Sequence, residues 1–183
     1  PDYLDKESKK IAETIIKKNK FTAKASEKIS MTLVNKKKVI EFIIIGLGEK
    51  KKLDAKNTRQ YLFDGLKNII GKVLFSFDNK DLDNIDILAE VVEHINYKFD
   101  KYFSKKKEEF LEVSYLTDKK VPKLIEGYEL AKISNIVKDL VNEQAEVLNP
   151  KELADRATKL GKKFGFDVEI LDEKKAQKLG MNA

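Results

Sequence analysis

Side chains able to do acid–base, nucleophilic or metal chemistry are few and scattered in this sequence of 183 residues. Cysteine is absent, which excludes disulfides, thiolate metal sites and cysteine nucleophiles. The single histidine, His94, lies in a helical pattern without a second histidine or a recognisable triad partner, so we interpret it as a partly buried or surface residue. We therefore expect no catalytic, metal-binding or cofactor-binding residue in this chain.

Two short motifs have some features of ligand sites. Asp81, Asp83 and Asp86 crowd together as in a calcium loop, but no glycine occupies the turn position and no glutamate closes the frame. We interpret them as an acidic cluster at a helix N-terminus, where the helix dipole favours negative charge. Residues 46–48 (Gly-Leu-Gly) follow a strand pattern, where a phosphate-binding turn would lie. The third glycine and the lysine–serine pair of a P-loop are missing, which favours an ordinary strand end.

The charge balance raises the question of nucleic-acid binding, since the chain has a formal net charge of +6. Of its 37 basic residues only Arg59 and Arg156 are arginine, and lysine lacks the planar fork that binds phosphates and guanine edges in bidentate fashion. The lysine runs lie between expected elements, as solvated loops do. Four clustered aromatic residues have a spacing that favours core and rim positions over base stacking: Tyr97, Phe99, Tyr102 and Phe103. Nucleic acid is thus an unlikely partner.

The sequence also bears on location. The longest aliphatic run, residues 42–45, ends at Gly46, far short of the roughly 20 apolar residues of a membrane span. This excludes a membrane-spanning protein, and the absence of cysteine fits a reducing compartment, so we expect the cytoplasm. Because the chain starts with Pro1 and not methionine, we expect its natural beginning to lie upstream.

Helical and strand periods alternate through the first 120 residues. Period-two or continuous apolar patterns predict strands at residues 29–34, 39–45, 73–77 and 110–116, the second of them a central strand. Apolar residues three to four apart predict helices before the first strand and between the later ones. Such alternation predicts an α/β fold of the three-layer αβα type, in which helices cover both faces of a mixed, mainly parallel sheet.

The last sixty residues have a different texture. One long amphipathic helix is expected from Val121, followed by a loop and then a helix whose start is signalled by Asn149, Pro150 and Glu152. Alternating apolar residues predict a strand at 166–170, and Asp172 is expected to cap a short final helix. We therefore predict a connecting helix and an αβα stub, whose strand needs partner strands from outside this segment.

Particular segments carry a resemblance to a known family. Ile43-Ile44-Ile45-Gly46-Leu47-Gly48 and Tyr97-Lys98-Phe99-Asp100-Lys101-Tyr102 resemble motifs in the N-terminal domain of the leucyl (cytosol) aminopeptidase family. The opening of that family's catalytic domain is similar to four later segments, in order and spacing: Val137-Lys138-Asp139-Leu140-Val141-Asn142, Asn149-Pro150-Lys151-Glu152-Leu153-Ala154, Val168-Glu169-Ile170-Leu171-Asp172 and Leu179-Gly180-Met181. The chain departs from the family at Lys138, where arginine is usual, and in the loop holding Asn142, Gln144 and Glu146.

The resemblance implies an organisation and a function. Residues 1–120 would be the non-catalytic N-terminal α/β domain, 121–143 the connecting helix, and 144–183 the start of a catalytic domain truncated before its metal ligands. The parent would be a cytoplasmic, homo-hexameric exopeptidase that uses a zinc or manganese pair to release N-terminal amino acids from peptides. This chain would act in domain packing and oligomer assembly, with its own catalytic domain as a partner, and would be inactive alone.

Two alternatives from other classes stay open. The family's N-terminal fold is similar to macrodomains, which implies a possible nucleotide or ADP-ribose-binding module with residues 46–48 as its phosphate-facing turn. The other is a lysine-rich nucleic-acid-binding protein, whose affinity would fall steeply as salt rises.

Overall fold

The computed structural model describes residues 6–35, 38–76, 84–106, 109–116 and 121–181. Within them the chain forms six α-helices, one short 3-10 helix and four strands. Their order is α1 (Lys6–Lys18), β1 (Lys28–Asn35), β2 (Lys38–Ile45), η1 (Lys50–Lys52), α2 (Ala55–Leu66), β3 (Gly71–Ser76), α3 (Ile85–Asn96), β4 (Leu111–Leu116), α4 (Pro122–Asn142), α5 (Pro150–Phe164) and α6 (Glu173–Lys178). No helix in the described part of the chain is long and apolar enough to cross a membrane.

The chain divides into two compact units, Pro1–Ile136 and Val137–Ala183, with the division inside α4. Most of the first unit and all regular structure of the second match elements expected from the sequence, so a mixed α/β fold is confirmed. The domain boundaries predicted at 120/121 and 143/144 stay a prediction.

The strands of the described residues pair two by two. β1 and β2 form an antiparallel hairpin in which Lys28 lies opposite Ile45. β3 and β4 are parallel, from Gly71 opposite Leu111 to Ser76 opposite Leu116. Parallel neighbours require a crossover connection, and α3 lies in that connection. The result is two two-stranded sheets, where the sequence predicts one mainly parallel sheet with β2 at its centre; in the described residues β2 pairs with β1.

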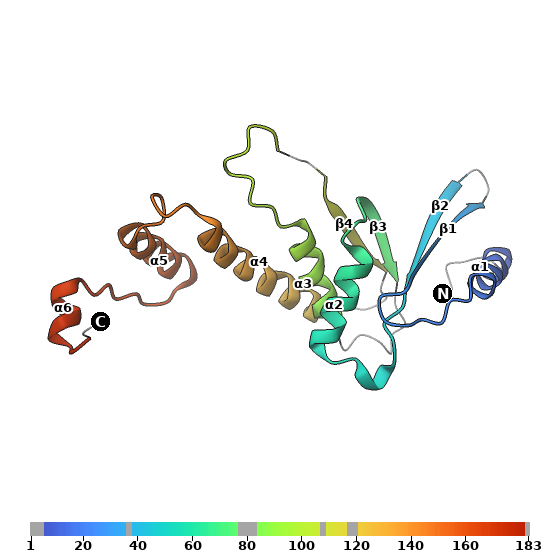
Figure 1. Ribbon diagram of the computed structural model, residues 1–183, viewed down its shortest axis with the longest axis horizontal. Coiled ribbons are helices and arrows are strands. Elements are labelled where there is room, and N and C mark those ends of the chain that lie inside the picture. The colour runs from blue at the N-terminus through green and yellow to red at the C-terminus, as the bar shows by residue number, and fades with distance from the viewer. Residues whose placement is uncertain (1–5, 36–37, 77–83, 107–108, 117–120, 182–183) are drawn as a thin grey trace. The chain divides into compact units, whose positions relative to one another are not determined.

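The core of the first unit lies where α2 and α3 pack beside β3 and β4 (Figure 1). Its buried apolar cluster combines residues from three elements: Leu62, Leu66, Ile87, Leu88, Val91, Val92 and Leu111. The helical period of the sequence predicts five of these seven positions, because residues three and four apart share one helix face: Leu62, Leu66, Leu88, Val91 and Val92. The same period continues to Ile69 and Val73 and so predicts a longer helix. In the structure α2 ends at Leu66, and both residues follow it.

Two helices of the first unit are tied by an ion pair beside this core. Nε of Arg59 on α2 lies 2.8 and 2.9 Å from the two carboxylate oxygens of Glu90 on α3. The Glu90 side chain is only 12% exposed. Because removing one partner would leave a largely desolvated charge, this pair fixes the packing of α2 on α3.

Helix starts follow the capping signals in the sequence. The side chain of Asp54 accepts a hydrogen bond from the backbone N–H of Asn57 at the start of α2, at 2.7 Å. Asn149 accepts from the N–H of Glu152 at 3.0 Å, and Asp172 from the N–H of Lys175 at 2.8 Å. Each cap satisfies one of the amides that a helix start leaves without an intrahelical acceptor.

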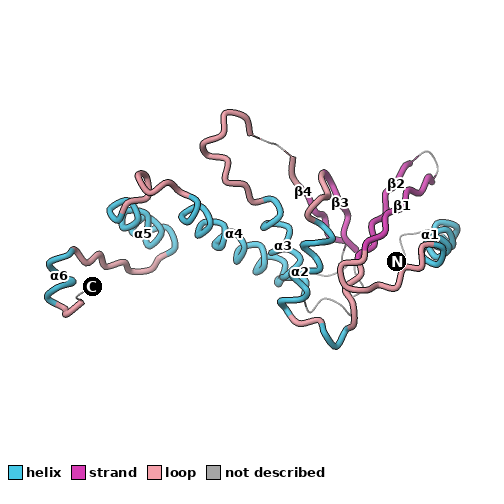
Figure 2. The backbone as a smooth tube through the Cα atoms, in the orientation of Figure 1, coloured by secondary structure: helices cyan, strands magenta, loops and turns pink. Residues whose placement is uncertain are grey.

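The second unit contains α5 and α6. Gly165 ends α5 in a left-handed conformation (φ 75°) that glycine adopts without steric cost. Arg156 on α5 binds Glu152 at 2.8 Å and lies 3.5 Å from Glu143, whose side chain is 3% exposed. The strand predicted at residues 166–170 is not formed, and Figure 2 shows a loop between α5 and α6. The prediction was wrong here because no second strand in the described part of this unit is available to bond with it.

The contact of α4 with α3 depends on a glycine. A Cβ built on Gly127 would lie 2.0 Å from the backbone oxygen of Asp86, well inside van der Waals contact. Gly127 is itself buried, so only a residue without a side chain allows the two helices to approach this closely.

We predict that Gly127→Ala lowers the free energy of unfolding by about 1–3 kcal/mol, the usual cost of overpacking. Urea denaturation followed by circular dichroism measures this. Glu126→Ala, at the exposed neighbouring position, is the control and should stay within about 0.5 kcal/mol of the parent. A stabilised Gly127→Ala would contradict the close contact, because alanine is favoured over glycine in a free helix by about 1 kcal/mol.

Candidate functional site

His94 lies in α3 between two polar neighbours. Its Nε2 is 3.5 Å from a carboxylate oxygen of Glu90, and its Nδ1 is 3.3 Å from the side-chain oxygen of Asn135 on α4. The ring is half-buried, as the sequence predicts. Glu90 is shared with Arg59, so these residues form a polar line across α2, α3 and α4. Neither Glu90 nor Asn135 carries a hydroxyl or thiol, so these described residues offer no nucleophile for the histidine to activate.

The acidic cluster considered as a calcium loop is described only in part. Asp86 lies in the first turn of α3, as expected of a carboxylate favoured by the helix dipole, while Asp81 and Asp83 lie outside the described residues. Among the residues that the structure describes, no group of three or more His, Cys, Asp or Glu side chains is placed to hold a metal ion.

The turn considered as a phosphate cradle has its glycine amides engaged. The N–H of Gly46 donates to the backbone oxygen of Glu27 at 2.7 Å, and the N–H of Gly48 donates to that of Ala23 at 2.9 Å. A phosphate-binding turn needs such amides free to point at the ligand. In this conformation neither of the two is.

Both arginines are likewise engaged within the fold. Arg59 binds Glu90 on α3, and Arg156 binds Glu152 beside Glu143 in the second unit. The two side chains best suited to phosphate recognition therefore serve internal ion pairs. Of the clustered aromatic residues, Tyr97 and Phe99 are half-buried and Phe99 packs edge-on against Tyr102, with ring centroids 6.0 Å apart, so the group is rim rather than a stacking platform.

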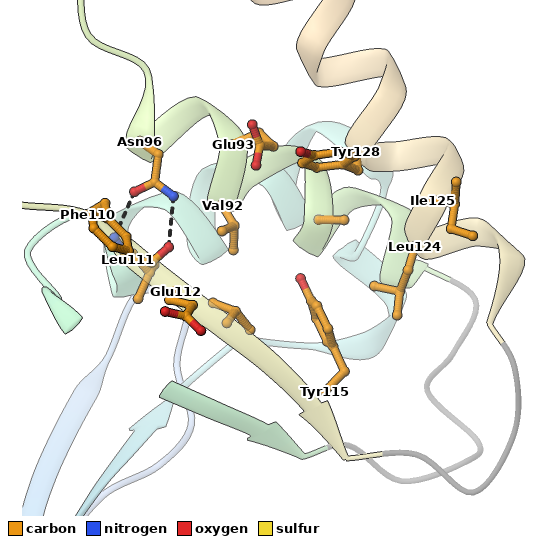
Figure 3. A pocket seen from close by; sticks show the side chains of 12 residues that line it. Val92, Glu93, Asn96, Phe110, Leu111, Glu112, Tyr115, Leu124, Ile125 and Tyr128 are labelled. Carbon is orange, nitrogen blue, oxygen red and sulfur yellow. Dashed lines mark hydrogen bonds between the residues drawn. The ribbon is translucent and has the colours of Figure 1, made fainter. Parts of the chain in front are cut away.

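A cavity of about 400 Å³ lies in the first unit between α3, β4 and the start of α4. Figure 3 shows its walls, with Leu124, Ile125 and Tyr128 projecting from α4. Most of the lining is apolar, and the polar side chains in it are Glu93, Asn96, Glu112, Tyr115 and Tyr128. Apolar walls with a few convergent polar groups are typical of small-molecule sites. Among the residues that the structure describes, no arginine or lysine lines this cavity.

Asn96 lies at one end of the cavity. Its side chain forms the two backbone hydrogen bonds that a neighbouring strand would otherwise form. Its side-chain amide donates to the backbone oxygen of Leu111 and accepts from the N–H of Leu111, both at 2.8 Å (Figure 3). Leu111 is the first residue of β4 and is only 2% exposed. Its backbone groups would otherwise be buried without partners, which proteins avoid.

Glu93 on α3 and Tyr115 on β4 both line the cavity (Figure 3). Burial raises the pKa of Glu93 above its ordinary value, although the charges of Lys132 and His94 oppose this. Burial, with a smaller contribution from the Glu93 charge, raises the pKa of Tyr115 to about 12. In both cases the low-dielectric surroundings disfavour the ionised form.

Sequence reasoning did not single out Glu93, Asn96 or Tyr115. Glu93 reads as a polar position of an amphipathic helix and Tyr115 as a residue of a strand. Their convergence depends on how α3 packs on β4, which no local pattern encodes. The one usable signal is Asn96 at the last position of α3, since asparagine is disfavoured inside helices and bonds readily to nearby backbone groups.

Comparison with known proteins places this geometry in a family. Residues 2–106 match the model of the N-terminal domain of the cytosol aminopeptidase family, and residues 135–183 match that of its catalytic domain. The chain belongs to the cytosol aminopeptidase family. The resemblance inferred from the sequence is thereby confirmed.

Individual relatives agree with this. The chain is 31% identical to a probable cytosol aminopeptidase of Sulfurihydrogenibium sp. over 92% of its own length and 36% of the relative's. It is 33% identical to that of Persephonella marina, over 91% of this chain and 37% of the relative. This member of the family thus spans little more than a third of the length of these relatives, and it covers only part of the catalytic domain.

The fold has a counterpart among solved structures. The bottromycin maturation enzyme BotP aligns with a TM-score of 0.71 at 21% identity, over 91% of this chain and 38% of that enzyme. At 21% identity, the comparison shows that this member of the cytosol aminopeptidase family and BotP share a fold.

We predict that Asn96→Ala lowers the free energy of unfolding by about 1–3 kcal/mol, because two buried backbone groups of Leu111 lose their partners. Chemical denaturation measures the change. Asn96→Asp is the matched variant: it keeps the acceptor for the Leu111 N–H but loses the donor to its oxygen, so it should also destabilise. An Asn96→Ala variant as stable as the parent would show that water replaces the amide.

We predict that Glu93→Gln raises the melting temperature at pH 7. With its pKa above the ordinary value in the folded state, the folded chain binds more protons than the unfolded chain between the two pKa values. Stability therefore falls as pH rises through this interval, and the ionised carboxylate is destabilising at neutral pH.

Thermal unfolding at pH 7 and at about pH 4, near the ordinary pKa of glutamate, tests the sign. The gain in Glu93→Gln should shrink at the lower pH. Glu126→Gln, exposed on α4, controls for the loss of a negative charge from a basic chain and should show no gain. Equal destabilisation of Glu93→Gln at both pH values would contradict the burial effect.

Proposed function

We propose that this chain is the N-terminal, non-catalytic portion of a cytosolic leucyl aminopeptidase and acts in domain packing and oligomer assembly. The observation that carries the proposal is the pair of family matches, one over the N-terminal domain and one over only the opening of the catalytic domain. The relatives are about three times as long, which leaves room in them for a catalytic site outside the part aligned here.

The exposed apolar side chains of the second unit support a packing role. Large apolar residues stand in solvent along it: Val141, Phe164, Phe166, Ile170, Leu179 and Met181. Val141 is 78% exposed and Leu179 65%. Many large apolar side chains left exposed in one short unit are consistent with a surface that another part of the protein covers. We propose that the remainder of a catalytic domain covers these side chains.

The family further implies a zinc or manganese pair, peptide substrates, a homo-hexamer and a cytoplasmic location, and we propose these for the whole protein. The described residues do not fit a metal pair, since no group of metal-ligating side chains converges in them. We therefore assign no catalytic step to this chain. From the family we also propose, for the assembled protein, the three-layer αβα architecture with a single sheet that is expected of the N-terminal domain.

We predict that the purified chain releases no product from leucine p-nitroanilide with zinc or manganese added. A full-length cytosol aminopeptidase assayed in parallel is the positive control, and absorbance of the released nitroaniline is the measurement. Turnover that scales with chain concentration and persists through successive purification steps would contradict the proposal.

A further inference from the structure

The cavity between α3, β4 and α4 is not accounted for by domain packing or oligomer assembly. Its volume of about 400 Å³ lies within the range of roughly 300–1,000 Å³ found for small-molecule sites. All its lining residues belong to the first unit. The apolar part of the lining comes from all three elements and includes Val92, Leu111, Val113, Leu124 and Ile125.

Two polar groups face this apolar space without a direct partner. Among the described residues, the Glu93 carboxylate has no hydrogen bond or ion pair within contact distance, and the Tyr115 hydroxyl has no hydrogen bond. Figure 3 shows the Tyr115 hydroxyl pointing into the cavity. A carboxylate and a hydroxyl acceptor that converge in an apolar cavity suit a ligand group with several N–H donors.

The sign of the charge narrows the class of ligand. Glu93 and Glu112 are the charged side chains of the described lining; Nζ of Lys72 lies 3.5 Å from a carboxylate oxygen of Glu112, and the charge of Lys132 acts on Glu93. Tyr128, also in the lining, already carries an ammonium group over its ring, since Nζ of Lys132 lies 4.1 Å from the ring centroid. Aromatic faces and carboxylates together favour ammonium ligands, whereas a ligand carboxylate would meet like charge in the Glu93 and Glu112 side chains.

We propose that this cavity binds a small apolar primary amine, with its ammonium group between the Glu93 carboxylate and the Tyr115 hydroxyl and its apolar body against Val92, Leu111 and Leu124. Because the charged side chains of the described lining, Glu93 and Glu112, are both acidic, we expect the site to prefer amines to free amino acids. The carboxylate supplies the charge-assisted hydrogen bond, and the apolar walls supply burial of the ligand body.

Titration of the intact chain with 2-phenylethylamine at pH 7.5, followed by ¹H–¹⁵N NMR, tests the proposal. We expect saturable shifts confined to residues of α3, β4 and the start of α4, with a Kd on the order of 1 mM for a ligand of this size. The alcohol 2-phenylethanol and the zwitterion phenylalanine should each bind at least about tenfold more weakly, because one lacks the charge and the other adds a carboxylate.

Variants identify the site. Glu93→Gln should weaken amine binding about tenfold or more, since a charge-assisted hydrogen bond becomes a neutral one. Tyr115→Phe, which keeps the ring and removes the hydroxyl, should weaken it by a smaller factor and serves if Glu93→Gln misfolds. Glu126→Gln is the matched control, exposed on α4 outside the cavity, and should bind like the parent.

Three results would overturn the proposal. They are an absence of saturable shifts at tens of millimolar amine, equal affinity for the amine and the alcohol, and unchanged amine affinity in both Glu93→Gln and Tyr115→Phe.

Discussion

Helix α3 is contacted on several sides, and most of the first unit depends on that constraint. One face supplies Ile87, Leu88, Val91 and Val92 to the buried cluster with α2 and β4. Burial of apolar surface at about 25 cal/mol per Å² makes this cluster the main favourable term in the fold of the unit. Because β3 and β4 are parallel, the chain must cross over between them, and α3 stands in that crossover.

The polar positions of α3 each serve a different neighbour. Glu90 binds Arg59 on α2, Asn96 bonds to Leu111 on β4, and His94 meets Asn135 on α4. Asp86 lies in the first turn of the helix, and Glu93 lines the cavity. An amphipathic helix is usually solvated on its polar side. Here neighbouring elements partly cover that side of α3, and the burial raises the pKa of Glu93. An acidic cavity therefore exists in a chain with a net charge of +6.

The arginines are likewise used in contacts within the fold. The chain carries 37 lysines and arginines, but both arginines are held in ion pairs with carboxylates of the fold. The glycine amides of residues 46 and 48 are held by backbone carbonyls. Features that suggest phosphate binding when read along the sequence are thus used to join one element to another.

The sequence by itself determined most of the helices and strands, where several helices begin, and which family the chain belongs to. These follow from local causes: the caps at Asp54, Asn149 and Asp172 act within one turn, and the apolar period of α3 lies within twelve residues. Only the tertiary structure decided how strands pair, that residues 166–170 stay a loop, and that Glu93, Asn96 and Tyr115 meet around one cavity. A strand needs a partner and a cavity needs walls from several elements, and both depend on residues far apart in the chain.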